Sequence, residues 1–108
     1  MTTFTLYDLE KRVSERAATS NAEESYTRKL LDRGISHCAK KLGEEAIETV
    51  LSALTEDRQR LTAEAADLLY HLLVVLKARD VTLADVEKVL AERQGMSGLE
   101  EKALRKAT

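Results

Sequence analysis

The segment from Thr62 to Ala78 constrains the fold of this chain more than any other stretch. After Asp67 it reads LLYHLLVVL, so apolar side chains would point in almost every direction around a helix. A helix of this kind is normally buried on several sides. The apolar run is interrupted by His71 and is far too short to span a bilayer. We therefore predict a central helix that other parts of the chain surround.

The rest of the chain also favours helices. None of its 108 residues is a proline, so nothing in the interior forbids long helices. Apolar residues recur at helical spacing, and no stretch alternates with the period of two that marks a strand. The expected helices cover about residues 5–17, 25–33, 35–55, 62–78 and 82–94. Between them we expect a polar loop at 18–24, a charged turn at 56–60, and a polar tail at 96–108 with one helical turn from Leu99.

Capping residues mark several helix ends. Thr5 with Asp8, and Thr82 with Asp85, have the spacing of a capping box. Glycine readily adopts the left-handed conformation that ends helices. The expected stop signals are Gly34 and Gly95.

Two further helices have an apolar side. The long helix over 35–55 has one apolar stripe, and the helix after Thr82 has an expected inner face. The stripe consists of Ile35, Ala39, Leu42, Ala46, Val50, Ala53 and Leu54, and the inner face of Leu83, Val86, Val89 and Leu90.

These features predict an all-α fold, a compact bundle of four to five helices that forms a single domain over residues 1–108. The central helix has more apolar surface than its short neighbours can cover. We therefore expect a homodimer to cover the remainder.

Composition restricts the function. The net charge is −2, aromatic residues make up 4%, and there is no tryptophan, which argues against nucleic-acid binding. A phosphate substrate is still compatible with this composition, because a bound divalent cation can supply positive charge.

The N-terminal sequence MTTFTLYDLEKR lacks the apolar core of a signal peptide, and Cys38 is the only cysteine. We expect a cytoplasmic protein without a membrane segment.

The candidate chemistry lies in two acidic pairs. Residues three apart lie about 60° apart around a helix axis, so Glu45 and Glu48 share a face, as do Glu64 and Asp67. His71 follows Asp67 by four residues and falls on the same stripe. If the two helices pack side by side, the four carboxylates converge and repel one another.

A divalent cation would relieve this repulsion. Mg²⁺ binds through carboxylate oxygens, water and substrate phosphate, and Mn²⁺ would fit as well. Zinc fits poorly, because histidine and thiolate ligands at suitable spacing are lacking. A simpler interpretation also exists. Lys40–Glu44 and Lys41–Glu45 are ordinary surface pairs, acids in a first turn complement the helix dipole, and His71 fits a hydrogen-bonded core residue.

In these two acidic motifs the sequence resembles a known family. The motif ExxE at residues 45–48, followed by ExxD at 64–67, is similar to the signature of the MazG-like, all-α NTP pyrophosphatases. Within this superfamily the closer resemblance is to the phosphoribosyl-ATP pyrophosphohydrolases of histidine biosynthesis. Three further stretches carry it over about residues 6–105. They are Ser25-Tyr26-Thr27 with Leu30 and Gly34, the stretch from Ala65 to His71, and Ser97-Gly98-Leu99-Glu100-Glu101-Lys102 with Arg93 and Arg105.

The resemblance implies hydrolysis of phosphoribosyl-ATP to phosphoribosyl-AMP and pyrophosphate, with Mg²⁺, in a helical dimer. A separate cyclohydrolase would take the next step. Glu45, Glu48, Glu64 and Asp67 are then the expected catalytic and metal-binding residues. Lys41 and Lys40 are expected to contact substrate phosphate because of their place beside the acids. Arg93, Lys102 and Arg105 are expected to do so only through the resemblance of the tail, and Glu44 stays open as an outer ligand or a base.

Two other functions fit some of the same features. One is a house-cleaning pyrophosphatase acting on free or damaged nucleoside triphosphates, which would share fold, metal and bond. The other is a non-catalytic helical dimerisation module, in which the acids serve only as solubilising charge. The house-cleaning function predicts that dNTPs are hydrolysed and phosphoribosyl-ATP is not. The dimerisation module predicts no Mg²⁺ binding.

Overall fold

The computed structural model describes residues 3–19, 25–55, 57–95 and 98–107, and this part of the chain contains six helices and no strand. The all-α prediction is confirmed. The helix count exceeds the expected four to five, because residues 98–107 form a full helix where one turn from Leu99 was predicted. The helices are α1 (Leu6–Ala17), α2 (Tyr26–Asp32), α3 (Ile35–Thr55), α4 (Arg58–Ala78), α5 (Leu83–Glu92) and α6 (Gly98–Ala107).

The predicted caps are present. Thr5 accepts a hydrogen bond from the N–H of Asp8 while the Asp8 carboxylate accepts one from the N–H of Thr5. Thr82 and Asp85 form the same capping box at α5. Gly34 follows α2 with φ of 93°, the left-handed conformation that glycine adopts without strain. Each side-chain cap typically stabilises a helix by about 1 kcal/mol.

The start of α4 corrects one prediction. The charged turn expected over 56–60 is wrong from residue 58 onward, since α4 begins at Arg58 rather than Thr62. Asp57 caps this earlier start by accepting a hydrogen bond of 2.8 Å from the N–H of Arg60. The extra turn places Arg60 one turn before Glu64. Residue 56, like residues 20–24 of the predicted loop, lies outside the described residues.

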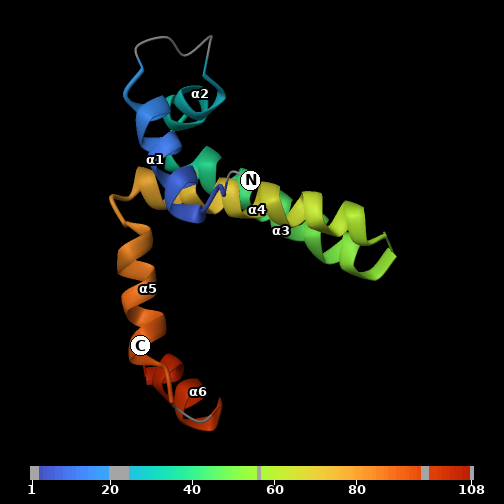
Figure 1. Ribbon diagram of the computed structural model, residues 1–108, viewed down its shortest axis with the longest axis vertical. Coiled ribbons are helices and arrows are strands. Elements are labelled where there is room, and N and C mark those ends of the chain that lie inside the picture. Colours follow the sequence, from blue (N-terminus) through green and yellow to red (C-terminus); the bar gives the residue numbers. More distant parts are fainter. Residues whose placement is uncertain (1–2, 20–24, 56, 96–97, 108) are drawn as a thin grey trace.

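The helices form a long hairpin with two additions (Figure 1). Helices α3 and α4 run antiparallel side by side, and α1 and α2 pack near the end where α4 finishes. Helix α5 leaves from that end and leads to α6, so the two make an arm that points away from the hairpin. We call α3 and α4 the hairpin, and α5 and α6 the arm.

The core lies where α1 to α4 meet. Its fully buried apolar residues come from all four helices, and α4 contacts each of the other three. Cys38 is among them, as expected of a small hydrophobe, and its thiol donates a hydrogen bond to the Leu30 carbonyl oxygen. The prediction of a central helix is therefore confirmed. The buried apolar residues are Val13, Leu30, Cys38, Leu73 and Val74.

The distal part of the apolar stripe of α3 is exposed, whereas Leu42 and Ala46 in its middle are half-buried. Its distal residues Val50 and Leu54 are exposed, Leu54 to 77%, whereas Cys38 and Ser52 on another face are buried.

The arm is similar, because Leu90 of its predicted inner face is 58% exposed. The inner-face prediction holds at Leu83, which packs against the core, and Val86 is half-buried. It is wrong within one chain at Val89 and Leu90, because α5 leaves the core after its first turn. None of the helices in the described part of the chain is long and apolar enough to cross a membrane.

Candidate active site

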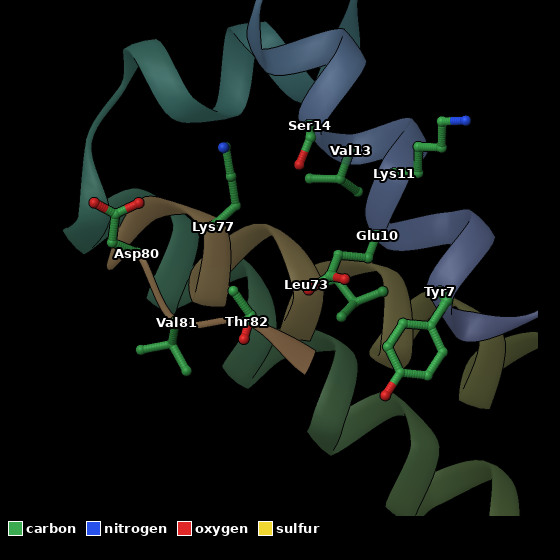
Figure 2. Close-up of a pocket in the computed structure, with 10 residues that line it drawn as sticks. All are labelled: Tyr7, Glu10, Lys11, Val13, Ser14, Leu73, Lys77, Asp80, Val81 and Thr82. Atoms are coloured by element: carbon green, nitrogen blue, oxygen red, sulfur yellow. The ribbon is translucent and has the colours of Figure 1, made fainter. Parts of the chain in front are cut away.

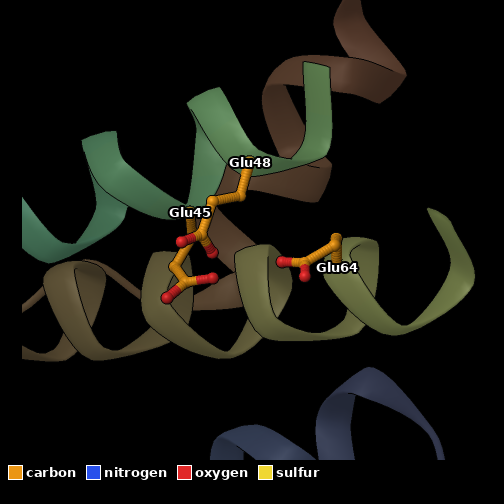
Figure 3. A group of neighbouring side chains, drawn as sticks. All are labelled: Glu45, Glu48 and Glu64. Atoms are coloured by element: carbon orange, nitrogen blue, oxygen red, sulfur yellow. The ribbon is translucent and has the colours of Figure 1, made fainter. Parts of the chain in front are cut away.

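Three acidic side chains meet in the middle of the hairpin (Figure 3). Glu45 and Glu48 extend from α3 and Glu64 from α4, and one carboxylate oxygen of each lies within 4.8 Å of the others. Spacing along α3 places the first two on adjacent turns of one face. Their meeting with Glu64 depends on how the two helices are aligned. We call these three residues the acidic cluster.

Thr49 contacts both helices at this place. Its hydroxyl lies 2.8 Å from the carbonyl oxygen of Glu45 on its own helix and 3.2 Å from the carbonyl oxygen of Glu64 on α4. The contact to α4 ties the backbones together beside the acidic cluster. A shift of α3 along α4 would break it and separate the carboxylates.

The acids are held in an unfavourable environment. Glu64 is 5% exposed, Glu45 is half-buried, and Glu48 is exposed. Burial raises the pKa of Glu45, and the neighbouring Glu48 raises it further. Burial also raises the pKa of Glu64, which Arg60 partly offsets. Within the described part of the chain, one buried oxygen each of Glu45 and Glu64 has no hydrogen-bond partner. Buried carboxylate oxygens in this state favour a bound cation or proton.

Asp67 lies close to the cluster without joining it. Its charge raises the pKa of both Glu45 and Glu64, so it lies within electrostatic range of them. Its side chain is exposed, and its carboxylate is not part of the group of three. The structure therefore brings together three of the four predicted acids and places the fourth nearby on α4.

His71 is a buried, hydrogen-bonded residue. Its Nδ1 lies 2.9 Å from the carbonyl oxygen of Asp67. Because a carbonyl oxygen only accepts, this nitrogen carries a hydrogen and Nε2 of the neutral ring is an acceptor. Nε2 is buried with no hydrogen-bond partner among the described residues. Its ring also contacts Tyr70 and Tyr26 edge-on, with centroids 5.0 and 6.2 Å away.

The predicted basic residues are divided between two places. Lys41 lies one turn before Glu45 on α3, with its ammonium 3.9 Å from a Glu44 oxygen, and Lys40 is exposed beside it. Glu44 thus faces Lys41 and is not part of the acidic cluster. The other three belong to the arm and are not brought to the cluster within one chain (Figure 1). They are Arg93 at the end of α5, and Lys102 and Arg105 on α6.

Two parts of the tail prediction lie outside what the structure describes. Ser97 falls between α5 and α6, and the side chain of Glu101 is not described. One functional neighbour, Arg60, was missed from sequence. It forms an ion pair of 3.1 Å with Glu64. The i, i+4 spacing of Arg60 and Glu64 would have revealed it if Asp57 had been recognised as a helix cap.

A cavity of about 310 Å³ lies between α1 and the corner where α4 meets α5 (Figure 2). It contains none of the acids above. Beside it, Glu10 accepts a hydrogen bond of 2.6 Å from the N–H of Leu83, and the hydroxyl of Tyr7 donates one to Glu87. These contacts attach the first turns of the arm to α1, so this region fixes where the arm leaves the core.

The antiparallel helix pair, which brings both acids of the ExxE motif together with Glu64 of the ExxD motif, is consistent with the class of all-α NTP pyrophosphatases. The family comparison is more specific. The family described as phosphoribosyl-ATP pyrophosphohydrolase matches residues 6–94. The chain belongs to the phosphoribosyl-ATP pyrophosphohydrolase family.

Individual relatives match along nearly their whole length. A Bradyrhizobium diazoefficiens protein named phosphoribosyl-ATP pyrophosphatase 1 is 59% identical over 98% of this chain and 99% of its own. Proteins named phosphoribosyl-ATP pyrophosphatase are also similar. The one from Nitrobacter winogradskyi is 59% identical over 97% of this chain and 90% of its own, and the one from Agrobacterium fabrum is 55% identical over 97% of each.

Proposed function

We propose that this protein hydrolyses phosphoribosyl-ATP to phosphoribosyl-AMP and pyrophosphate, the second step of histidine biosynthesis. Family membership and the names of its relatives support the substrate. The observation that carries the chemistry is the acidic cluster, whose three carboxylates lie within 4.8 Å of one another. A cytoplasmic location, a single domain over residues 1–108, and a cyclohydrolase acting on the product belong to the same proposal.

The residues present fit a hard divalent cation. The cluster offers only oxygen donors, and two of its buried oxygens have no hydrogen-bond partner among the described residues. Mg²⁺ prefers such donors, and Mn²⁺ shares the preference. Glu45, Glu48 and Glu64 would hold the metal, with Asp67 next to them. Bound there, it would supply positive charge to the phosphate oxygens as the anhydride breaks.

The protein's own groups do the remaining work. Lys41 projects one turn before Glu45, where its ammonium can contact a phosphate of the chain being cut, and Lys40 lies beside it. A carboxylate of the acid group that is not occupied by metal would orient water for in-line attack on one phosphorus of the anhydride between the α and β phosphates, whose bond to the bridging oxygen then breaks. Thr49 keeps the acids of both helices aligned while the charge redistributes.

A homodimer is the second part of the proposal. Val50 and Leu54 expose an apolar strip along α3, and an exposed strip of this kind typically marks an interface. The arm residues Arg93, Lys102 and Arg105 are proposed phosphate contacts that do not reach the cluster within one chain. Their role therefore depends on the dimer, in which the arm of one copy meets the hairpin of the other.

One assay tests the activity. Purified protein with phosphoribosyl-ATP and Mg²⁺ should release pyrophosphate, and chelation by EDTA should stop the release until excess Mg²⁺ is added. Parallel reactions with dATP and dUTP should be much slower. Turnover of the dNTPs without turnover of phosphoribosyl-ATP would replace the proposal with a house-cleaning function.

A further inference from the structure

A second cavity lies between α2 and α3. It has a volume of about 250 Å³, below the roughly 300–1,000 Å³ of sites that enclose a drug-sized ligand. It therefore suits one part of a larger substrate. We call it the cationic pocket, and it is lined by Tyr26, Lys29, Leu30, Arg33, His37 and Lys41.

The lining concentrates positive charge in a chain whose net charge is −2. Three of the six residues are permanently charged cations, and no carboxylate is among them. In the described part of the chain no acid forms an ion pair with Lys29 or Arg33, and Lys41 has only its 3.9 Å contact to Glu44. Burial lowers the pKa of His37, and the charges of Arg33 and Lys41 lower it further. Unmatched cations around a small cavity favour a phosphate.

The cationic pocket adjoins the acidic cluster. Lys41, which lines the pocket, lies one turn before Glu45 on α3. Tyr26 provides a second connection, because its ring lines the pocket and lies 6.2 Å from the ring of His71. His71 in turn lies within electrostatic range of Glu45. One ligand with phosphate groups at two ends could therefore occupy both places.

We propose that the cationic pocket binds the phosphate of the phosphoribosyl group, while the acidic cluster acts on the triphosphate. This inference rests on the proposed function. At the acidic cluster, a bound metal and Lys41 would supply positive charge to the triphosphate. The pocket also contains Lys29 and Arg33, so binding of a phosphate there requires no metal. Arg33 can form a forked contact to the phosphate, Lys29 a single one, and the Tyr26 ring offers an apolar face to the sugar.

In this role the pocket determines the specificity for phosphoribosyl-ATP over ATP. Phosphoribosyl-ATP differs from ATP by the phosphoribosyl group alone. A site that binds this group favours the substrate over ordinary nucleoside triphosphates, whereas the acids and the metal would bind the triphosphate of both in the same way.

The test removes a pocket cation and compares ligands with and without the phosphoribosyl group. Arg33→Gln should raise the Kd of phosphoribosyl-AMP, measured by calorimetry, roughly 10- to 100-fold and leave the Kd of AMP unchanged. The kcat/KM for phosphoribosyl-ATP should fall by a similar factor, mainly through KM. Arg79→Gln makes the same charge change outside the pocket and should behave as wild type in both measurements. Lys29→Gln is a second variant, and both pocket cations are exposed, so folding should survive.

The outcomes separate this inference from the function on which it rests. Equal weakening of AMP and phosphoribosyl-AMP would mean that the pocket holds another phosphate, and unchanged binding of both would exclude the pocket as a substrate site. Either result overturns the inference even if the wild type hydrolyses phosphoribosyl-ATP. A wild type that cannot hydrolyse phosphoribosyl-ATP would instead refute the proposed function.

Discussion

The two halves of α4 are buried for opposite reasons. Its C-terminal half packs Leu73 and Val74 into the apolar core against α1 and α2. Its N-terminal half buries Glu64 against α3, beside Glu45. The first arrangement stabilises the fold, and the second costs stability, because buried carboxylates lose hydration. We call the C-terminal half of α4 the structural end and its N-terminal half the chemical end. Substitutions at the structural end should change stability, and substitutions at the chemical end should change activity.

The chemical end should give the largest effect. Glu48→Gln removes an oxygen ligand from the acidic cluster while keeping the shape of the side chain. We expect Mg²⁺-dependent pyrophosphate release to fall by about 10³-fold, since loss of even a supporting group at a metal site costs 10- to 100-fold. Thermal unfolding should show a folded protein. Asp67→Asn tests the fourth acid in the same assay, and full activity in both variants would refute the metal assignment.

The structural end should respond in stability. Leu73→Ala leaves a cavity in the core, and we expect the free energy of unfolding to fall by about 3 kcal/mol. The kcat of the protein that remains folded should be close to that of the wild type. Denaturant titration and active-site kinetics on the same preparation check both halves of this prediction. A large loss of kcat with unchanged stability would contradict the separation of the two ends.

A third prediction concerns the apolar strip of α3. Leu54→Glu places a charge in the proposed dimer interface, so the dimer should dissociate to a monomer in analytical ultracentrifugation. We expect activity at low protein concentration to fall about tenfold, since the arm would lose its partner. Thr55→Glu adds the same charge next to the strip and serves as the matched control. Identical sedimentation of both variants and the wild type would rule out this interface.

The smallest effect should appear in the pH dependence of stability. The pKa of Glu45 is raised in the folded protein above its ordinary value of 4.5, mainly by burial. The folded state therefore binds the proton more tightly than the unfolded state. Its stabilising contribution is complete below the unfolded pKa and is lost as the pH rises through the folded pKa.

Glu45→Gln should remove the loss of stability that the wild type shows as the pH rises through the pKa of Glu45. Without metal, the variant should have a higher Tm than the wild type at pH 7.5, and the difference should disappear near pH 4. Added Mg²⁺ should raise the Tm of the wild type and leave that of Glu45→Gln nearly unchanged. A variant that is less stable than the wild type at pH 7.5 in EDTA would show that Glu45 is not strained in the apoprotein.

Sequence reasoning predicted the local structure well. The bounds of α3, Ile35–Thr55, and the capping boxes at Thr5 and Thr82 are as expected, because caps and helical spacing act within a few residues. The start of α4 was placed four residues late, since Asp57 was assigned to a turn when it caps the helix. Arg60 was therefore missed as the partner of Glu64.

The candidate site could be predicted only in part. The pairs Glu45 with Glu48 and Glu64 with Asp67 follow from three-residue spacing on a helix. Their convergence needed the alignment of α3 with α4, at which Thr49 contacts both helices, and that alignment brings in Glu64 while leaving Asp67 outside the group of three. Of the cationic pocket the sequence indicated only Lys41 as a phosphate contact, because the lining residues come from two helices that meet at the Gly34 turn.

The sequence by itself determined the preference for helices over strands, which the described residues follow, and which acids share a helix face, since these depend on neighbours within one or two turns. Only the tertiary structure decided that α3 turns Glu45, Thr49 and Ser52 toward α4 and leaves Val50 and Leu54 exposed. In this arrangement α1 and α2 pack at one end of the hairpin, and the Thr49 hydroxyl of α3 contacts the Glu64 carbonyl oxygen of α4. Contacts between residues far apart in the chain set it, and no local pattern records them.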